Sequence, residues 1–64
     1  MSKALKEYEV IFANLNLGCV GERIFRAANA EQAVEMAWEK IDHEDDYISM
    51  VLDEDGEMVW EGSP

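Results

Sequence analysis

One helical pattern lies between two pairs of strand-like patterns, and this order restricts the fold more than any other feature of the sequence. Between Ala30 and Ile41, apolar residues recur at the spacing of one side of an α-helix. Before and after this segment, apolar and polar residues alternate with a period of two, which is typical of half-buried strands. We therefore expect one amphipathic helix that packs on a sheet.

The alternating segments predict four strands, at residues 6–14, 22–28, 47–53 and 57–61. The first two are expected to be joined by a long connection over 14–21, because this stretch contains two Asn and two Gly. Between the last two, Asp55-Gly56 favours a two-residue type I′ turn, in which both residues have positive φ. The prediction is one α+β domain, residues 1–64, with the order β-β-α-β-β and a mainly antiparallel sheet that carries the helix on one face.

The helix has a clear start signal. Asn29 is a preferred N-cap residue, and Gln32 stands three residues later, as in a capping box. We expect the helix to run from Ala30 to about Asp42. Trp38 belongs to its apolar stripe and is expected in the core.

A lone helix covers only one face of a four-stranded sheet, so the other face must meet water or a partner. The predicted strands carry large apolar side chains on both faces, and a surplus apolar patch marks a contact surface. Its expected members are Ile11, Val51, Val59 and Trp60. Trp60 fits either the core or the anchor of an interface. One hypothesis is therefore a homodimeric structural or adaptor domain that binds through this sheet face.

The net charge of −10 is concentrated in the second half of the chain. Residues 1–28 hold four Lys and Arg against three Glu, whereas residues 29–64 hold twelve Asp and Glu against Lys40 alone. A field of one sign repels nucleic acid and anionic membranes and attracts basic surfaces. We expect as partner a basic protein or a nucleic-acid-handling complex, with no direct binding of nucleic acid or membrane.

Glu31, Glu35 and Glu39 follow one another at four-residue spacing, about 6 Å apart along a helix. Like charges at this spacing destabilise a helix by about 0.2–0.5 kcal/mol per pair. The row is either the solvated face of an acidic protein or a ladder of carboxylates, spaced roughly like backbone phosphates, for a basic groove. The candidate partner-binding residues are Glu31, Glu35, Glu39, Asp42, Asp45, Asp46, Asp53, Glu54, Asp55 and Trp60.

Sequence motifs of catalysis and of metal binding are missing. The sequence has no Gly-rich phosphate loop, no HExxH pattern and no EF-hand spacing. Cys19 is the only cysteine, expected exposed in the first connection, so no intrachain disulfide forms. His43 is expected to cap the last helical turn. We expect no enzymatic activity, no cofactor and no metal. An apolar run of membrane-spanning length and a signal-peptide pattern are also missing, which predicts a cytoplasmic location.

Two segments, FRAANAEQAVEMA at 25–37 and YISMVLDEDG at 47–56, resemble a pattern of small phage and plasmid accessory proteins. In these proteins a strand, a capped Ala/Glu-rich helix and a D-x-D-G hairpin follow one another, and some of them are anti-CRISPR or antirestriction inhibitors. The similarity covers about half of the chain. Strongly acidic members of the inhibitor class imitate DNA by their charge and block a nucleic-acid groove. The resemblance implies a non-catalytic DNA-mimic inhibitor in the cytoplasm of a phage-infected host cell.

Overall fold

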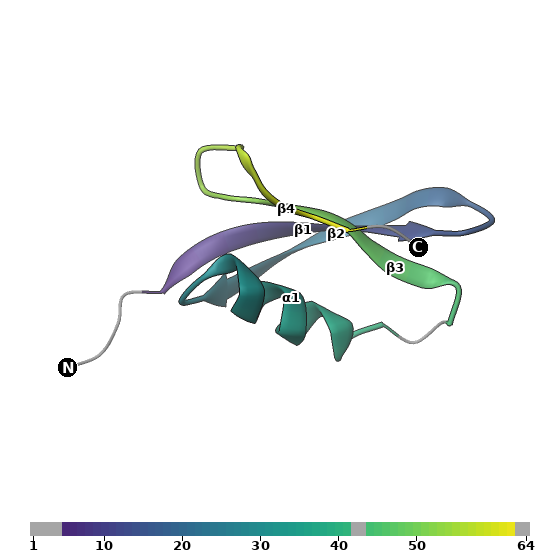
Figure 1. Cartoon of the computed structure of the whole chain (residues 1–64), viewed down its shortest axis with the longest axis horizontal. Helices are drawn as coiled ribbons and strands as arrows, with labels where there is room; N and C mark the ends of the chain where they lie inside the picture. The colour runs from purple at the N-terminus through teal and green to yellow at the C-terminus, as the bar shows by residue number, and fades with distance from the viewer. Residues whose placement is uncertain (1–4, 42–43, 63–64) are drawn as a thin grey trace.

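The computed structural model describes residues 5–41 and 44–62. The elements are β1 (Lys6–Asn14), β2 (Gly18–Ala27), α1 (Ala30–Trp38), β3 (Asp46–Leu52) and β4 (Met58–Glu61). The strands form one antiparallel sheet in the order β2-β1-β3-β4. Helix α1 lies against one face of this sheet (Figure 1). The predicted α+β class, the element order and the position of the helix are confirmed.

Asn29 caps α1 as the sequence predicts. Its Oδ1 accepts a hydrogen bond of 2.8 Å from the backbone N–H of Gln32. In return, Gln32 Oε1 accepts a 2.7 Å bond from the backbone N–H of Ala28, one residue before the position that a capping box uses. Two backbone donors at the helix start are thus satisfied by side chains, which fixes where the helix begins.

The helix ends at Trp38, before the expected limit near Asp42, which lies outside the described residues. The N–H of Lys40 and the N–H of Ile41 each bond to a carbonyl three residues back, at 2.9 and 3.3 Å, which tightens the last turn. Trp38 therefore sits at the helix end and at the margin of the apolar stripe. Its side chain is 48% exposed, so the expectation that it lies in the core is wrong.

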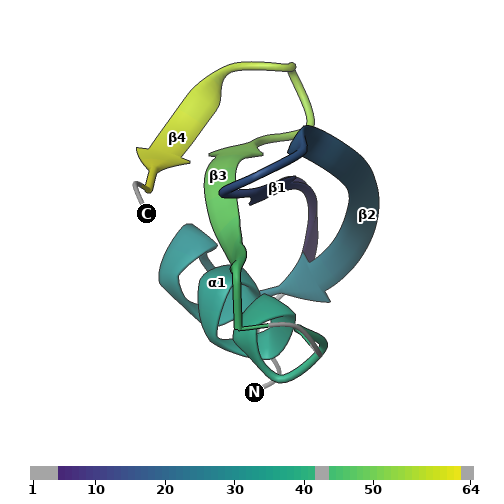
Figure 2. The same cartoon turned by 90° about the vertical axis from the view of Figure 1, so that its right-hand side faces the viewer.

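The core lies between α1 and the sheet. Three small or branched helix residues, Ala33, Val34 and Ala37, point into it. The sheet contributes Tyr8, Val10, Phe25, Ala27, Ile48 and Val51. Because Ala33 and Ala37 are fully buried and carry only a methyl group, the helix approaches the strands closely. Figure 2 shows α1 beneath the middle strands, with β2 and β4 at the two edges.

A bulge in β3 decides which of its side chains face the helix. Val51 pairs with Val10 and Ile48 pairs with Phe12, which leaves Ser49 as the extra residue. The shift of one residue brings Ile48 and Val51 to the same side of the sheet. Strict alternation would place them on opposite faces, so the expectation that Val51 belongs to the surplus apolar face is wrong.

A second bulge, in β4, turns Trp60 toward the helix side. Trp60 pairs with Val51 and Met58 pairs with Leu52, which leaves Val59 as the extra residue. Val51 is fully buried, and the half-buried Trp60 packs against the core. Val51 is therefore not a member of the surplus face, and Trp60 lies on the core side of the sheet.

The first hairpin connection is short. Only residues 15–17 lie between β1 and β2, and β2 begins at Gly18, whose φ is +79°. Ala13 pairs with Cys19 and Phe12 with Gly21, so Val20 forms a bulge that keeps this Gly-containing stretch in the sheet. The expected long connection over 14–21 is therefore wrong.

The second hairpin also differs in its turn. Gly56 has a φ of +83°, and no residue other than Gly has a positive φ in the described ranges, so Asp55-Gly56 is not a type I′ turn. The N–H of Gly56 donates to the carbonyl of Asp53 at 3.0 Å, and the N–H of Asp53 donates to the carbonyl of Glu57 at 2.9 Å. These bonds define a three-residue connection with a left-handed Gly at its end.

Candidate binding surfaces

The acidic row on α1 has the geometry that the sequence predicts. Glu31 and Glu35 are exposed on the helix, and Glu39 is exposed at its C-cap with helical backbone angles. None of the three carboxylates accepts a hydrogen bond or forms an ion pair within residues 5–41 and 44–62. Successive members stand one helical turn apart, about 6 Å along the axis. The row is therefore available to a partner along its whole length.

Two candidate acids at the start of β3 have internal partners instead. Asn14 Nδ2 donates a hydrogen bond of 2.6 Å to Asp46 Oδ1. Asn16 Nδ2 donates one of 3.2 Å to Asp45 Oδ2, and the N–H of Leu15 donates one of 2.9 Å to the Asp45 carbonyl. Both aspartates thus hold the first hairpin turn against β3, a role that sequence reasoning missed.

The acids of the second hairpin divide in the same way. Asp53 Oδ1 accepts hydrogen bonds of 2.9 Å from the N–H groups of Asp55 and Glu57 and so organises the turn. Glu54 Oε2 lies 3.5 Å from the N–H of Glu7, which brings this loop to the start of β1. Asp55 is exposed at the tip. Of the candidate acids in this loop, Asp55 is the one whose carboxylate has no hydrogen-bond partner among the described residues.

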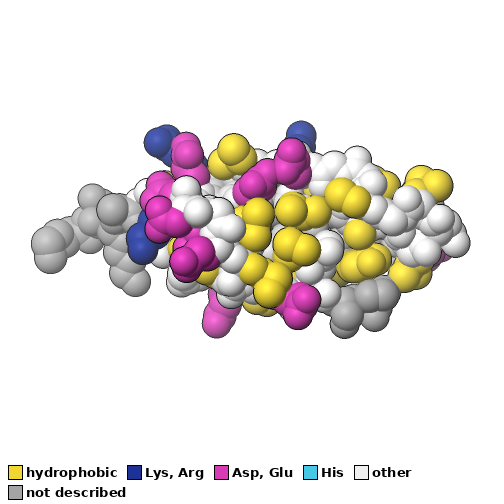
Figure 3. Space-filling model, turned by 90° about the horizontal axis from the view of Figure 1, so that it is seen from above, with side chains coloured by type: hydrophobic (Ala, Val, Ile, Leu, Met, Phe, Trp, Pro, Cys, Tyr) yellow, Lys and Arg dark blue, Asp and Glu magenta, His cyan; other side chains and the backbone are white. Residues whose placement is uncertain are grey.

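The face of the sheet opposite to α1 carries a band of apolar side chains, which Figure 3 shows in yellow. We call it the open face. Ile24 and Met58 stand out most, with exposures of 66% and 52%. The strand register places on this face Ile11, Ala13, Ile24, Tyr47, Met50, Leu52 and Met58. The predicted surplus apolar face therefore exists, although the bulges change its membership.

Carboxylates lie around the open face and, at Glu9, within it. They come from β1, β2, β4 and the second hairpin, and we call them the acidic margin: Glu7, Glu9, Glu22, Glu54 and Glu61. The magenta groups at the edges of the yellow band in Figure 3 show this arrangement of charge. Close to the margin, a hollow of about 160 Å³ is lined by Glu7, Glu9, Ile24, Asp53 and Glu54.

Two acids of the margin interact directly. A hydrogen bond with Glu22 raises the pKa of Glu9, and both burial of the carboxyl and repulsion from the Glu22 charge act in the same direction. Two carboxyl groups this close hold a proton between them more readily than either holds one alone. At the opposite end of the margin, Arg26 Nε lies 3.9 Å from Glu7 Oε2, and both side chains are exposed.

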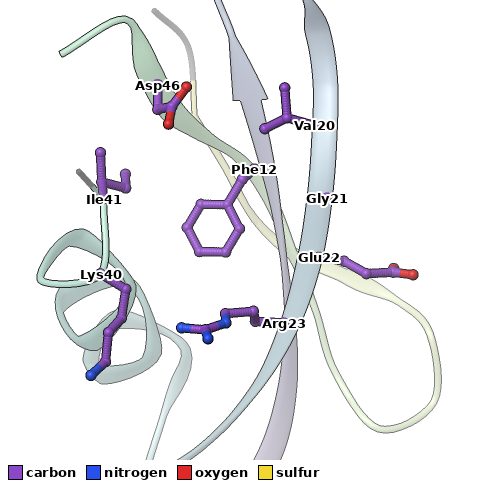
Figure 4. A pocket seen from close by; sticks show the side chains of 8 residues that line it. All are labelled: Phe12, Val20, Gly21, Glu22, Arg23, Lys40, Ile41 and Asp46. Atoms are coloured by element: carbon purple, nitrogen blue, oxygen red, sulfur yellow. The ribbon is translucent and has the colours of Figure 1, made fainter. Parts of the chain in front are cut away.

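A second hollow, of about 320 Å³, lies on the helix side near the end of α1 (Figure 4). The Phe12 ring stands in its middle, the Arg23 side chain reaches toward it from β2, and Lys40 lies at the end of the helix. Asp46 also lines the hollow, whereas the Glu22 side chain points away from it. Because cations and an acid share the lining, the hollow has no uniform charge that would select an anionic ligand.

Among the described residues, no group of three or more His, Cys, Asp or Glu side chains is placed to hold a metal ion. Cys19 is exposed, as predicted, while Asp42 and His43 lie outside the described ranges. The described helix lacks the length and the apolar character needed to cross a membrane. No family description, curated protein or solved structure matches the chain.

Proposed function

We propose that this chain is a non-catalytic binding protein, an inhibitor of the DNA-mimic kind, which occupies a basic nucleic-acid-binding groove of a target protein. The observation that carries the proposal is the row of Glu31, Glu35 and Glu39, three exposed carboxylates one turn apart without partners in the described part of the chain. The other candidate acids lie near the two ends of α1: Asp46, next to Asp45, lines a hollow with Lys40 and Ile41, and Asp53, Glu54 and Asp55 line a hollow with Ala30.

The scaffold of the row supports such a role. Helix α1 is capped by Asn29 and held on the sheet by Ala33 and Ala37, so the carboxylates are presented on an ordered element. Little conformational entropy is then lost on binding. Each groove cation that pairs with a carboxylate is withheld from phosphate, and complementary fields also speed association.

The position of Glu39 favours binding over helix stability as the reason for the row. Glu31 lies in the first turn, where the helix dipole stabilises an anion, but Glu39 lies at the C-cap, where the dipole destabilises it. The last turn also contains no basic residue. An acid at this end lowers helix stability. Its presence is explained if Glu39 contributes a negative charge to the surface that binds the partner.

The test is capture of partners from a cell lysate at low salt, elution with a salt gradient, and competition between the chain and DNA for each captured protein. The resemblance to anti-CRISPR and antirestriction inhibitors makes CRISPR surveillance complexes and restriction enzymes the first targets to examine. We expect the triple variant E31K/E35K/E39K to lose the DNA-competing binding. The control E7K/E22K/E61K changes the net charge equally, on the open face across the sheet from the row, and should keep most of this binding. If E31K/E35K/E39K still binds the target fully in competition with DNA, the proposal is wrong.

The second candidate function is a homodimeric structural or adaptor domain that binds through the open face. The exposed Ile24 and Met58 favour it, because large apolar side chains gathered on one face are typical of an interface. Light scattering over a wide range of concentration tests self-association. A monomer at every concentration rules out the homodimer.

A further inference from the structure

We propose that the open face binds a basic, amphipathic segment of a partner protein, with the segment's apolar side chains on Ile11, Met50 and Leu52 and its Lys or Arg side chains in the acidic margin. The inference rests on the proposed function in one respect, since both require a cationic partner. It places the contact on the other side of the sheet from the acidic row of α1.

The apolar part of this surface is continuous over β1, β3 and β4. Ile11 and Met50 are paired neighbours on β1 and β3, and Leu52 pairs with Met58 on β4. Ile24 lies on β2, where its pairing partner Glu9 separates it from Leu52. Helix α1 covers the other face, so no described element lies over the band (Figures 1 and 3). A segment with one apolar side would remove these side chains from water.

The charges around the band select the occupant. A second copy of the chain, docked by a two-fold axis, would bring two acidic margins together, because such an interface pairs the same patch with itself. Like charges that face one another weaken an interface. Nucleic acid and anionic lipid meet the same repulsion. A basic amphipathic segment gains both apolar contact and opposite charge, so it fits the face better than any of these.

The hollow beside the band fits the side chain of a Lys or Arg. Its volume of about 160 Å³ is well above the roughly 10–15 Å³ that a cavity needs to hold one water. Ile24 forms an apolar part of its lining, on which the aliphatic stem of Lys or Arg can lie. The rest of the lining consists of acidic residues, Glu7, Glu9, Asp53 and Glu54, which favours a cationic end there. The contact of Arg26 with Glu7 shows that a guanidinium already approaches one of them.

The interaction between Glu9 and Glu22 gives the proposal a measurable consequence. Their hydrogen bond and mutual repulsion raise the pKa of Glu9. A partner cation beside Glu9 favours its ionised form and so lowers this pKa again. Binding must then release protons at a pH just above the ordinary pKa of Glu, and the affinity for the partner must increase as the pH rises through that range.

The test uses the full chain and short synthetic helical peptides with Leu on one side and Lys, Gln or Glu on the other, studied by calorimetry and by NMR. We expect the Lys peptide alone to bind and to shift the amide signals of Ile11, Met50 and Leu52. Binding should weaken about tenfold or more, roughly 1.4 kcal/mol, in the double variant I24S/M58S. Both replaced side chains are largely exposed, so the fold is expected to survive the change.

A matched pair of variants separates this inference from the proposed function. E9Q/E22Q and E31Q/E35Q each remove two negative charges, the first pair from the margin and the second from the row on α1. We expect the first to weaken peptide binding clearly more than the second. Equal binding of the Gln peptide, or loss through the α1 variant alone, would overturn the inference. The two proposals can also fail separately. If the chain captures a target in competition with DNA, E31K/E35K/E39K loses that target, and the Lys peptide does not bind, then the proposed function stands and this inference is wrong.

Discussion

Asn14 Nδ2 donates a hydrogen bond of 2.6 Å to Asp46 Oδ1 and so joins the end of β1 to the start of β3. The Oδ1 atom of the same Asn14 accepts the N–H groups of Asn16 and Leu17, at 2.9 and 3.1 Å. Among the described residues Asn14 is the one polar side chain that is buried, with 7% exposure. One amide therefore connects the first hairpin turn, β1 and β3.

Replacement of Asn14 by Ala should destabilise the fold by about 2 kcal/mol, because it leaves two turn N–H groups and the Asp46 carboxylate without their partner. Urea unfolding monitored by circular dichroism measures the change. Asn16→Ala is the control, since Asn16 is exposed and its side chain makes one bond of 3.2 Å, and it should cost less than about 0.5 kcal/mol. Equal losses in the two variants would contradict the role given to Asn14.

The sequence predicts this fold where the signal is local. Asn29 and Gln32 lie three residues apart and identify the helix start, and the period of two gives the limits of β1 correctly. The four-residue spacing of the acidic row on α1 is likewise a local pattern. These features depend on neighbouring residues, so one sequence suffices to predict them.

The remaining features depend on residues far apart in the chain. Nothing near Ser49 marks the bulge that turns Ile48 toward the helix, because it arises from pairing with β1. The internal role of Asp46 requires Asn14, which lies 32 residues away. The surplus apolar face and its member Ile11 could be predicted from the sequence, but the rest of its membership could not.

The two tryptophans should behave differently. Trp60 is half-buried and packs against the core, whereas Trp38 is 48% exposed at the end of α1. Trp60→Ala should cost about 2 kcal/mol or more, since it leaves a gap beside Val51, and Trp38→Ala less than about 1 kcal/mol. Fluorescence of the single-Trp variants W38F and W60F gives an independent measure. Emission from Trp60 should lie at shorter wavelength, and the reverse order would contradict the packing.

Gly62, which follows β4, lies too close to β3 and to the Trp60 ring to carry a side chain. A Cβ atom there would run into the carbonyl oxygen of Ile48 and stand 2.6 Å from carbons of the Trp60 ring, while the Gly62 N–H bonds to Ser49 at 2.9 Å. Gly62→Ala should therefore destabilise by about 1–3 kcal/mol, as overpacking does. Gly21→Ala is the matched control, because no atom lies within 4 Å of its added Cβ, and it should be neutral or slightly stabilising. Thermal unfolding compares them, and a loss in Gly21→Ala as large as that in Gly62→Ala would contradict the close approach.

The pair of Glu9 and Glu22 should make stability depend on pH. The hydrogen bond with Glu22 raises the pKa of Glu9 above its ordinary value of 4.5, so just above this pH the native state keeps a proton that the unfolded chain has lost. The contribution of the pair is therefore complete below pH 4.5 and is lost as the pH rises through the native pKa. Glu9→Gln keeps a donor for Glu22 but cannot titrate, so the stability of this variant relative to the wild type should increase with pH over that range. Glu22→Gln removes the same repulsion from the other side and should give a relative change of the same sign. Urea titrations at a series of pH values measure both, and curves parallel to that of the wild type would show that the two carboxyls titrate independently.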